Sequence, residues 1–77
     1  MTRLPVVSDM EVVAALKKAG YVLVRQRGSH MRMRHPENPG RKPVTVPGHK
    51  EVKPGLLRKV VKDANLSVEE FRKLAGR

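Results

Sequence analysis

The sequence predicts an α+β fold with the element order α-β-β-β-α, in which helices cover one face of a three-stranded antiparallel sheet. Three observations predict it. A capped helical pattern follows Ser8, three short β-prone segments separated by turn residues occupy positions 21–47, and a second helical pattern begins at Pro54. Consecutive strands with helices before and after them favour a two-layer architecture.

The chain has 77 residues, which predicts a single domain. Its core is expected over about residues 8–65, with a short C-terminal helical extension over 66–77. A chain of this size buries only about 60% of the surface that its unfolded form exposes. We therefore expect one small core and one binding surface.

The first helix is predicted from Asp9 to about Ala19. Ser8 and Glu11 form a capping box at its start, and Gly20 is a typical residue for its end. Its apolar side chains recur at helical spacing and predict the buried stripe Val12, Val13, Leu16 and Ala19.

A β-hairpin is predicted next, because Gly28-Ser29 is a two-residue turn of the type II′ kind between β-prone segments 21–27 and 30–35. This turn would place Arg27 opposite His30. The same register pairs Arg25 with Arg32, and Leu23 with Arg34.

Side chains alternate between the two faces of a strand, and opposed residues share a face. One face is therefore predicted to carry Arg25, Arg27, His30, Arg32 and Arg34. The other face, which is expected to cover the core, would carry Val22, Val24, Gln26, Met31 and Met33. Like charges opposite one another destabilise a hairpin, so an anionic ligand explains the cationic face better than a merely solvated surface does.

The remaining elements follow from turn residues and periodicity. The segment 42–47 predicts a short edge strand, with Val44 and Val46 on one face and a proline at each end. A helix is expected from Pro54 to about Ala64, with the apolar stripe Leu56, Leu57, Val60, Val61 and Ala64. A second capping box, Ser67 to Glu70, opens a third helix that ends near residue 75, with Val68, Phe71 and Leu74 facing the body.

The charge balance indicates a nucleic-acid partner. The formal net charge is +10, from 17 Lys and Arg against 7 Asp and Glu, and the sequence pI is about 11.0. Tyr21 and Phe71 are the only Tyr, Phe or Trp side chains, which does not favour an aromatic stacking platform.

Cofactors, metals and membranes have little support in the sequence. There is no cysteine, and the acidic residues are scattered, so we expect no cofactor and no metal site. No apolar run reaches the roughly 20 residues of a membrane span, and the N-terminal segment is too short for a signal peptide. We therefore expect a cytoplasmic protein without a membrane partner.

The histidines suggest RNA cleavage. RNA supplies its own nucleophile, the 2′-OH, and a histidine with a pKa near neutrality can take or deliver the proton. His30 lies among arginines that can hold the phosphate, so it is the candidate catalytic residue, although a simple phosphate contact is the alternative. His35, before Pro36, is expected to be structural or capping, and His49 to be a second acid/base group or a phosphate contact.

The segment Gly20-Tyr21-Val22-Leu23-Val24-Arg25-Gln26-Arg27-Gly28-Ser29-His30 resembles the signature of the HicA toxins, the YcfA-like mRNA interferases. The downstream His35-Pro36, Val44-Thr45-Val46-Pro47 and Lys53-Pro54-Gly55 also match, and the resemblance runs from about Met10 to Asn65. It implies a double-stranded-RNA-binding-domain-like fold, ribosome-independent mRNA cleavage, and a HicB-type antitoxin that covers the active site.

The resemblance assigns catalysis to the histidine of the Gly-Ser-His motif, which is His30 here. The cationic hairpin and the loop after the third strand predict the RNA-binding residues Arg25, Arg27, Ser29, Arg32, Arg34 and Lys50. Two alternatives stay open: a non-catalytic RNA-binding module of the same fold, and an interaction protein whose basic face docks an acidic partner. The third helix lies beyond the usual end of the family's domain.

Overall fold

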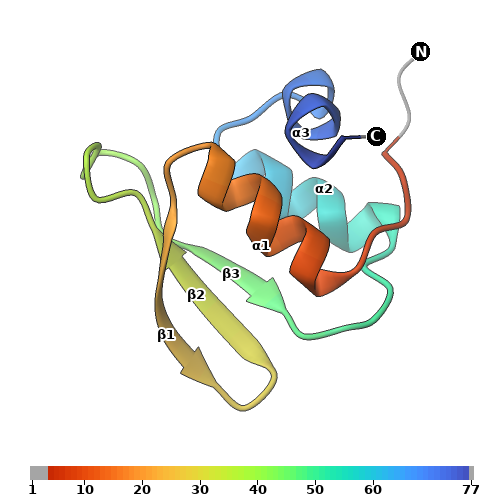
Figure 1. The fold of residues 1–77 in the computed structure, drawn as a ribbon, viewed down its shortest axis with the longest axis horizontal. Helices are drawn as coiled ribbons and strands as arrows, with labels where there is room; N and C mark the ends of the chain where they lie inside the picture. The colour runs from red at the N-terminus through yellow and green to blue at the C-terminus, as the bar shows by residue number, and fades with distance from the viewer. Residues whose placement is uncertain (1–3, 77) are drawn as a thin grey trace.

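The computed structural model, which describes residues 4–76, has the predicted order of elements, including the predicted helix at the C-terminal end (Figure 1). The elements are α1 (Asp9–Lys18), β1 (Val22–Arg27), β2 (His30–Arg34), β3 (Val44–Pro47), α2 (Pro54–Asp63) and α3 (Val68–Ala75). The strands form one antiparallel sheet in the order β1-β2-β3. The predicted α+β class and the antiparallel sheet are therefore confirmed.

The ends of α1 are fixed by local chemistry. The Ser8 hydroxyl accepts a hydrogen bond from the Glu11 amide, and the Glu11 carboxylate accepts one from the Ser8 amide. At the other end Gly20 has φ +102°, and the Tyr21 amide donates to the Leu16 carbonyl at 3.0 Å. This is a Schellman arrangement, in which a glycine takes the left-handed conformation. The predicted start and stop of this helix are confirmed.

The core lies between the helices and the two strands β2 and β3. Met31 and Met33 of β2 and Val44 and Val46 of β3 are buried, whereas the residues between them are exposed. This alternation places one face of β2 and β3 against the helices. Figure 1 shows the β1–β2 hairpin reaching away from the helices at its turn.

The pairing of the first half of β1 differs from the prediction. Arg27 pairs with His30 and Arg25 with Arg32, as predicted, but the register shifts between Leu23 and Arg25. As a result Leu23 lies opposite Met33, whereas the prediction placed it opposite Arg34. A β-bulge at Val24 accounts for the difference, because one extra residue in a strand moves every later pair by one position.

The predicted core face of β1 is also wrong. All six residues of β1 are exposed, and Val22, Leu23 and Val24 keep 43%, 41% and 52% of their surface accessible. β1 and β3 are the two edge strands of the sheet, but the buried side chains of the sheet belong to β2 and β3. The hairpin therefore packs against the core mainly through the buried side chains of β2.

Segments at both ends of the described chain complete the core. Leu4 and Val7 are buried, and the Val52 amide donates a hydrogen bond to the Val7 carbonyl at 2.6 Å. This isolated β-bridge, which connects the segment before α1 to the loop before α2, was not predicted from the sequence. From α3, Phe71 is fully buried, as its predicted orientation requires.

Candidate functional site

The hairpin turn places His30 at the end of the sheet. Gly28 has φ +59°, and Ser29 is not among the residues with positive φ, which is the pattern of a type II′ turn. His30 begins β2, where it pairs with Arg27 on one side and Pro47 on the other. The predicted turn therefore brings His30 between the two neighbouring strands.

A shallow groove, which we call the arginine groove, lies on the exposed face of the sheet. It has a volume of about 210 Å³ and is lined by Arg25, Arg27, His30, Arg32 and Thr45. All five side chains are exposed. Three guanidinium groups beside an imidazole, with no acid in the lining, make a surface suited to a phosphate or another anion.

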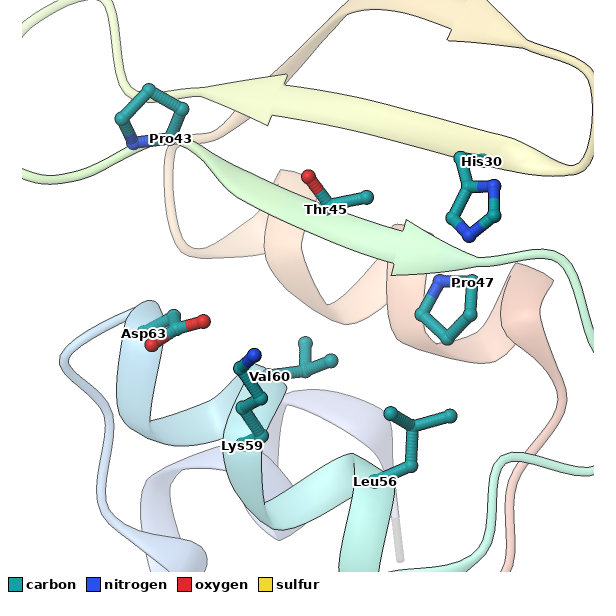
Figure 2. A pocket seen from close by; sticks show the side chains of 8 residues that line it. All are labelled: His30, Pro43, Thr45, Pro47, Leu56, Lys59, Val60 and Asp63. Carbon is teal, nitrogen blue, oxygen red and sulfur yellow. The ribbon is translucent and has the colours of Figure 1, made fainter.

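A second groove, which we call the helix groove, separates β3 from α2. It has a volume of about 270 Å³, and Figure 2 shows its lining residues His30, Pro43, Thr45, Pro47, Leu56, Lys59, Val60 and Asp63. The imidazole of His30 lies beside Pro47, and the polar ends of Lys59 and Asp63 reach from α2 toward β3. The two grooves share His30 and Thr45, so they meet at the histidine.

The structure gathers some of the predicted site residues and separates others. Arg25, Arg27, Arg32 and His30 line one groove. Arg34 is exposed but pairs with Val22 near the other end of the hairpin, and it lines neither groove. Ser29 and Lys50 are exposed as well, in the hairpin turn and in the loop after β3, and they also lie outside both linings.

His35 has a structural environment. Its Nε2 lies 3.2 Å from the Ala19 carbonyl oxygen, which can only accept, so the imidazole donates this hydrogen bond. Its ring meets Tyr21 edge-on at a centroid distance of 5.2 Å. A Cβ at Gly20 would lie only 2.6 Å from His35 Nε2. These contacts hold the end of α1 against the end of β2, in agreement with the capping role expected for His35.

His49 takes part in the fold through its backbone. Its carbonyl accepts a hydrogen bond from the Asp9 amide at 3.0 Å, and its amide donates to the Pro47 carbonyl at 3.0 Å. The side chain is exposed and lines neither groove. In this structure His49 thus does not share a groove with His30.

Seven of the residues that line the helix groove were not identified from the sequence as site residues. Thr45 is the outward residue of a short strand, Lys59 and Asp63 lie four residues apart on α2, and Leu56 was assigned to the core. The assignment of Leu56 is wrong, since 40% of its surface is exposed. Only Asp63 could have been noticed from the sequence as a candidate site residue. A negative charge in the last turn of a helix interacts unfavourably with the helix dipole, so an acid at this position is unusual.

Two kinds of feature are absent from the part of the chain that the structure describes. Among residues 4–76, no group of three or more His, Asp or Glu side chains is placed to hold a metal ion. Within the same residues, no helix is long and apolar enough to span a membrane.

The chain matches a known protein family over most of its length. The model of the family described as HicA toxin of bacterial toxin–antitoxin matches residues 10–66, which are 57 of the 77 residues. The match runs from α1 through Leu66, which follows α2, and ends before α3. No curated protein matches the chain significantly. The chain belongs to the HicA toxin family and is the toxin of a toxin–antitoxin pair.

Proposed function

We propose that this toxin is a metal-independent endoribonuclease that cleaves mRNA in the cytoplasm, with His30 as its acid/base group. The observation that carries the proposal is the position of His30 at the junction of two grooves, beside three arginines. Membership of the HicA toxin family supports the same activity. An RNA phosphate in the arginine groove would lie next to the imidazole.

The chemistry needs one proton acceptor and one proton donor near the scissile phosphate. The 2′-OH attacks the neighbouring phosphorus, the bond to the 5′-oxygen breaks, and a 2′,3′-cyclic phosphate forms. An imidazole with an ordinary pKa of about 6.5 is suited to take the 2′-OH proton or to give a proton to the leaving oxygen. His30 is exposed, which leaves it accessible to a bound RNA.

The arginines would hold the phosphate and stabilise the charge that develops on it. Arg25 and Arg32 are directly opposed on β1 and β2, and Arg27 is opposed to His30. Guanidinium groups bind phosphate oxygens through paired hydrogen bonds, and donors aimed at developing charge lower the barrier. This role also explains why two like charges face one another across the hairpin. Arg34, Ser29 and Lys50 would contact the RNA backbone outside the grooves.

The partner protein of this toxin is proposed to be a HicB-type antitoxin that covers the arginine groove. The groove is exposed in the toxin alone, and the lining carries cations without an acid. An antitoxin that inserts acidic or polar side chains there would exclude RNA and neutralise the opposed arginines.

A non-catalytic RNA-binding module is the second candidate. One observation favours it: among residues 4–76, no group forms a hydrogen bond that orients the His30 ring. An imidazole without an orienting partner serves a phosphate contact as well as it serves proton transfer. Catalytic hydrogen bonds often form only when the substrate is bound, so the two candidates need an experimental test.

The test is His30→Ala, with His35→Ala as the matched control. Because His30 is exposed, its truncation should change the free energy of unfolding by no more than about 0.5 kcal/mol. Loss of an acid/base group should lower the cleavage rate about a hundredfold or more. His35→Ala removes the contacts with Ala19 and Tyr21, so it should lower thermal stability.

Cleavage by the purified proteins and thermal melting are measured side by side, together with RNA binding. A folded His30→Ala protein that binds RNA but does not cut it supports the enzyme. If the His30→Ala variant cleaves RNA at the wild-type rate, His30 takes no part in the mechanism. A wild-type protein that binds RNA in a salt-dependent way without cutting it would favour the non-catalytic module.

A further inference from the structure

We propose that the helix groove is a base-binding subsite, which holds one unpaired nucleobase beside the phosphate in the arginine groove and prefers guanine. The inference rests on the proposed RNA binding and adds a substrate preference to it. The two grooves share the lining residues His30 and Thr45. In RNA each phosphate is flanked by a nucleoside, so a strand whose phosphate lies at His30 has a base within reach of the helix groove.

The size of the groove suits one nucleotide. Its volume of about 270 Å³ lies just below the roughly 300–1,000 Å³ of pockets that take drug-sized ligands. The groove lies open between β3 and α2, so a base can enter it while the ribose and phosphates stay on the surface. Single-stranded RNA presents its bases in this splayed form.

Apolar side chains form the walls. Pro47 and Val60 are buried, and Leu56 keeps 40% of its surface exposed. An exposed leucine is ordinary when it stands alone, but Leu56 shares one groove lining with two prolines and a valine. Tyr21 and Phe71, the two aromatic side chains, are 1% and 0% exposed. A base bound here would therefore pack its flat face on aliphatic and proline surfaces.

Helix α2 contributes one hydrogen-bond donor and one acceptor to the groove. Lys59 and Asp63 lie four residues apart on α2, which places them on the same side of the helix. Figure 2 shows both side chains reaching toward β3. Asp63 is the sole acid in the linings of the two grooves.

The helix dipole and the binding of a phosphate both disfavour a carboxylate at this position, although Asp63 also lines a hollow with Arg41, Lys42 and Lys62. Asp63 is the last residue of α2, where the helix dipole disfavours a negative charge. It also lies close to a cationic surface whose proposed ligand is an anion. A hydrogen bond between this carboxylate and the edge of a base would explain why an acid is present here despite the helix dipole and the nearby phosphate site.

Guanine is the base whose hydrogen-bonding edge matches the carboxylate of Asp63 and the ammonium group of Lys59. Its N1–H and N2–H are adjacent donors that can fill both oxygens of one carboxylate, and O6 beside them can accept from an ammonium group. Adenine, cytosine and uracil each present one donor group on that edge, so they leave a carboxylate oxygen without a partner. A good bidentate contact discriminates between bases by about tenfold or more.

The experiment measures binding without cleavage. The wild-type protein is titrated with 2′-O-methyl hexanucleotides, which lack the 2′-OH nucleophile, and fluorescence anisotropy gives the affinity. One probe is all uridine, and the others carry a single central guanosine, adenosine or cytidine. We expect the guanosine probe to bind about tenfold more tightly than each of the other three.

Matched variants test the two polar groups. Asp63→Asn and Glu69→Gln each remove one negative charge, and Glu69 is an exposed residue of α3 that lines neither groove. Both should raise the affinity for the three probes without guanosine, but Asp63→Asn alone should reduce the guanosine preference to about twofold or less, because it removes the contact with the base. Lys59→Met should also reduce the preference, whereas Lys62→Met, which removes a charge from α2 outside the two grooves, should keep it.

The results separate this inference from the proposed function. Equal affinity of the wild-type protein for all four probes would overturn the base subsite, even if the protein cuts RNA. A guanosine preference that survives both Asp63→Asn and Lys59→Met would also overturn it. A preference that disappears in those variants, in a protein without cleavage activity, would support the subsite and refute the proposed nuclease.

Discussion

The backbone of Gly48 lies directly against the carbonyl group of Ser29, so a Cβ at position 48 would collide with that carbonyl oxygen. The contact joins the turn of the β1–β2 hairpin to the segment that leaves β3. It sits beside the pairing of His30 with Pro47. The glycine thus allows the close approach that places the catalytic candidate at the end of β3.

Gly48→Ala should therefore lower both stability and cleavage. We expect the free energy of unfolding to fall by about 1–3 kcal/mol, because the added methyl group must displace the hairpin turn. The same shift should reduce cleavage by up to about a hundredfold, since His30 follows Ser29 directly. Gly55→Ala is the control: nothing lies within 4 Å of its added Cβ, and alanine in a helix should stabilise by about 0.4–1 kcal/mol. If urea denaturation shows that the free energy of unfolding changes in the same direction in both variants, this account is contradicted.

The cationic face can be tested through salt dependence. Arg25→Gln, Arg32→Gln and Arg34→Gln should each weaken binding of single-stranded RNA. Each should also lower the slope of log affinity against log salt by about 0.7, the value for one lost phosphate contact. Arg58→Gln on α2, outside both grooves, serves as the control for net charge. If the slope is unchanged in all three hairpin variants, the RNA binds elsewhere.

Cleavage should persist in excess chelator. The seven Asp and Glu residues are scattered along the sequence, and attack by the 2′-OH needs an acid/base group near the phosphate. The products should carry a 2′,3′-cyclic phosphate and a 5′-hydroxyl, which mass spectrometry of a cleaved oligonucleotide distinguishes from other ends. Activity that disappears with EDTA, or products with 5′-phosphates, would show that water attacks the phosphate with the help of a metal.

The last helix should be needed for the stability of the whole chain. We propose that all 77 residues form one domain, in which α3 extends a core spanning about residues 8–65. Phe71 is fully buried, so Phe71→Ala should lower the free energy of unfolding by about 3–5 kcal/mol. Leu74→Ala, at a half-buried position of the same helix, should cost less. A single cooperative melting transition is expected for the wild-type protein, and a separate transition of α3 would refute the single domain.

Local signals in the sequence were sufficient to predict the elements. The capping boxes at Ser8 and Ser67, the glycine after α1 and the Gly28-Ser29 turn each involve groups only a few residues apart. Such features depend on the backbone of one segment, so the residue pattern determines them without knowledge of the fold. The hairpin register near the turn follows for the same reason, which is why Arg25, Arg27 and His30 were correctly predicted to share a face.

The predictions failed where residues distant in the sequence decide the outcome. The bulge at Val24 changes the pairing of Leu23 at the far end of the hairpin, where the turn no longer fixes the register. Leu56 fits the apolar periodicity of α2, but it lies at the edge of the helix layer and remains 40% exposed. Its exposure depends on where β3 lies beside α2, and helical periodicity holds no information about that.

The sequence alone therefore determined the elements, the cationic hairpin with His30 and the resemblance to the HicA toxins. Each of these rests on residue types and short spacings, whose physical effects act within a single turn, strand or helix. The tertiary structure decided that Asp63, Lys59 and Leu56 lie across a groove from Thr45 and His30. Packing of α2 beside β3 brings these residues together, and packing depends on the shape of the whole core.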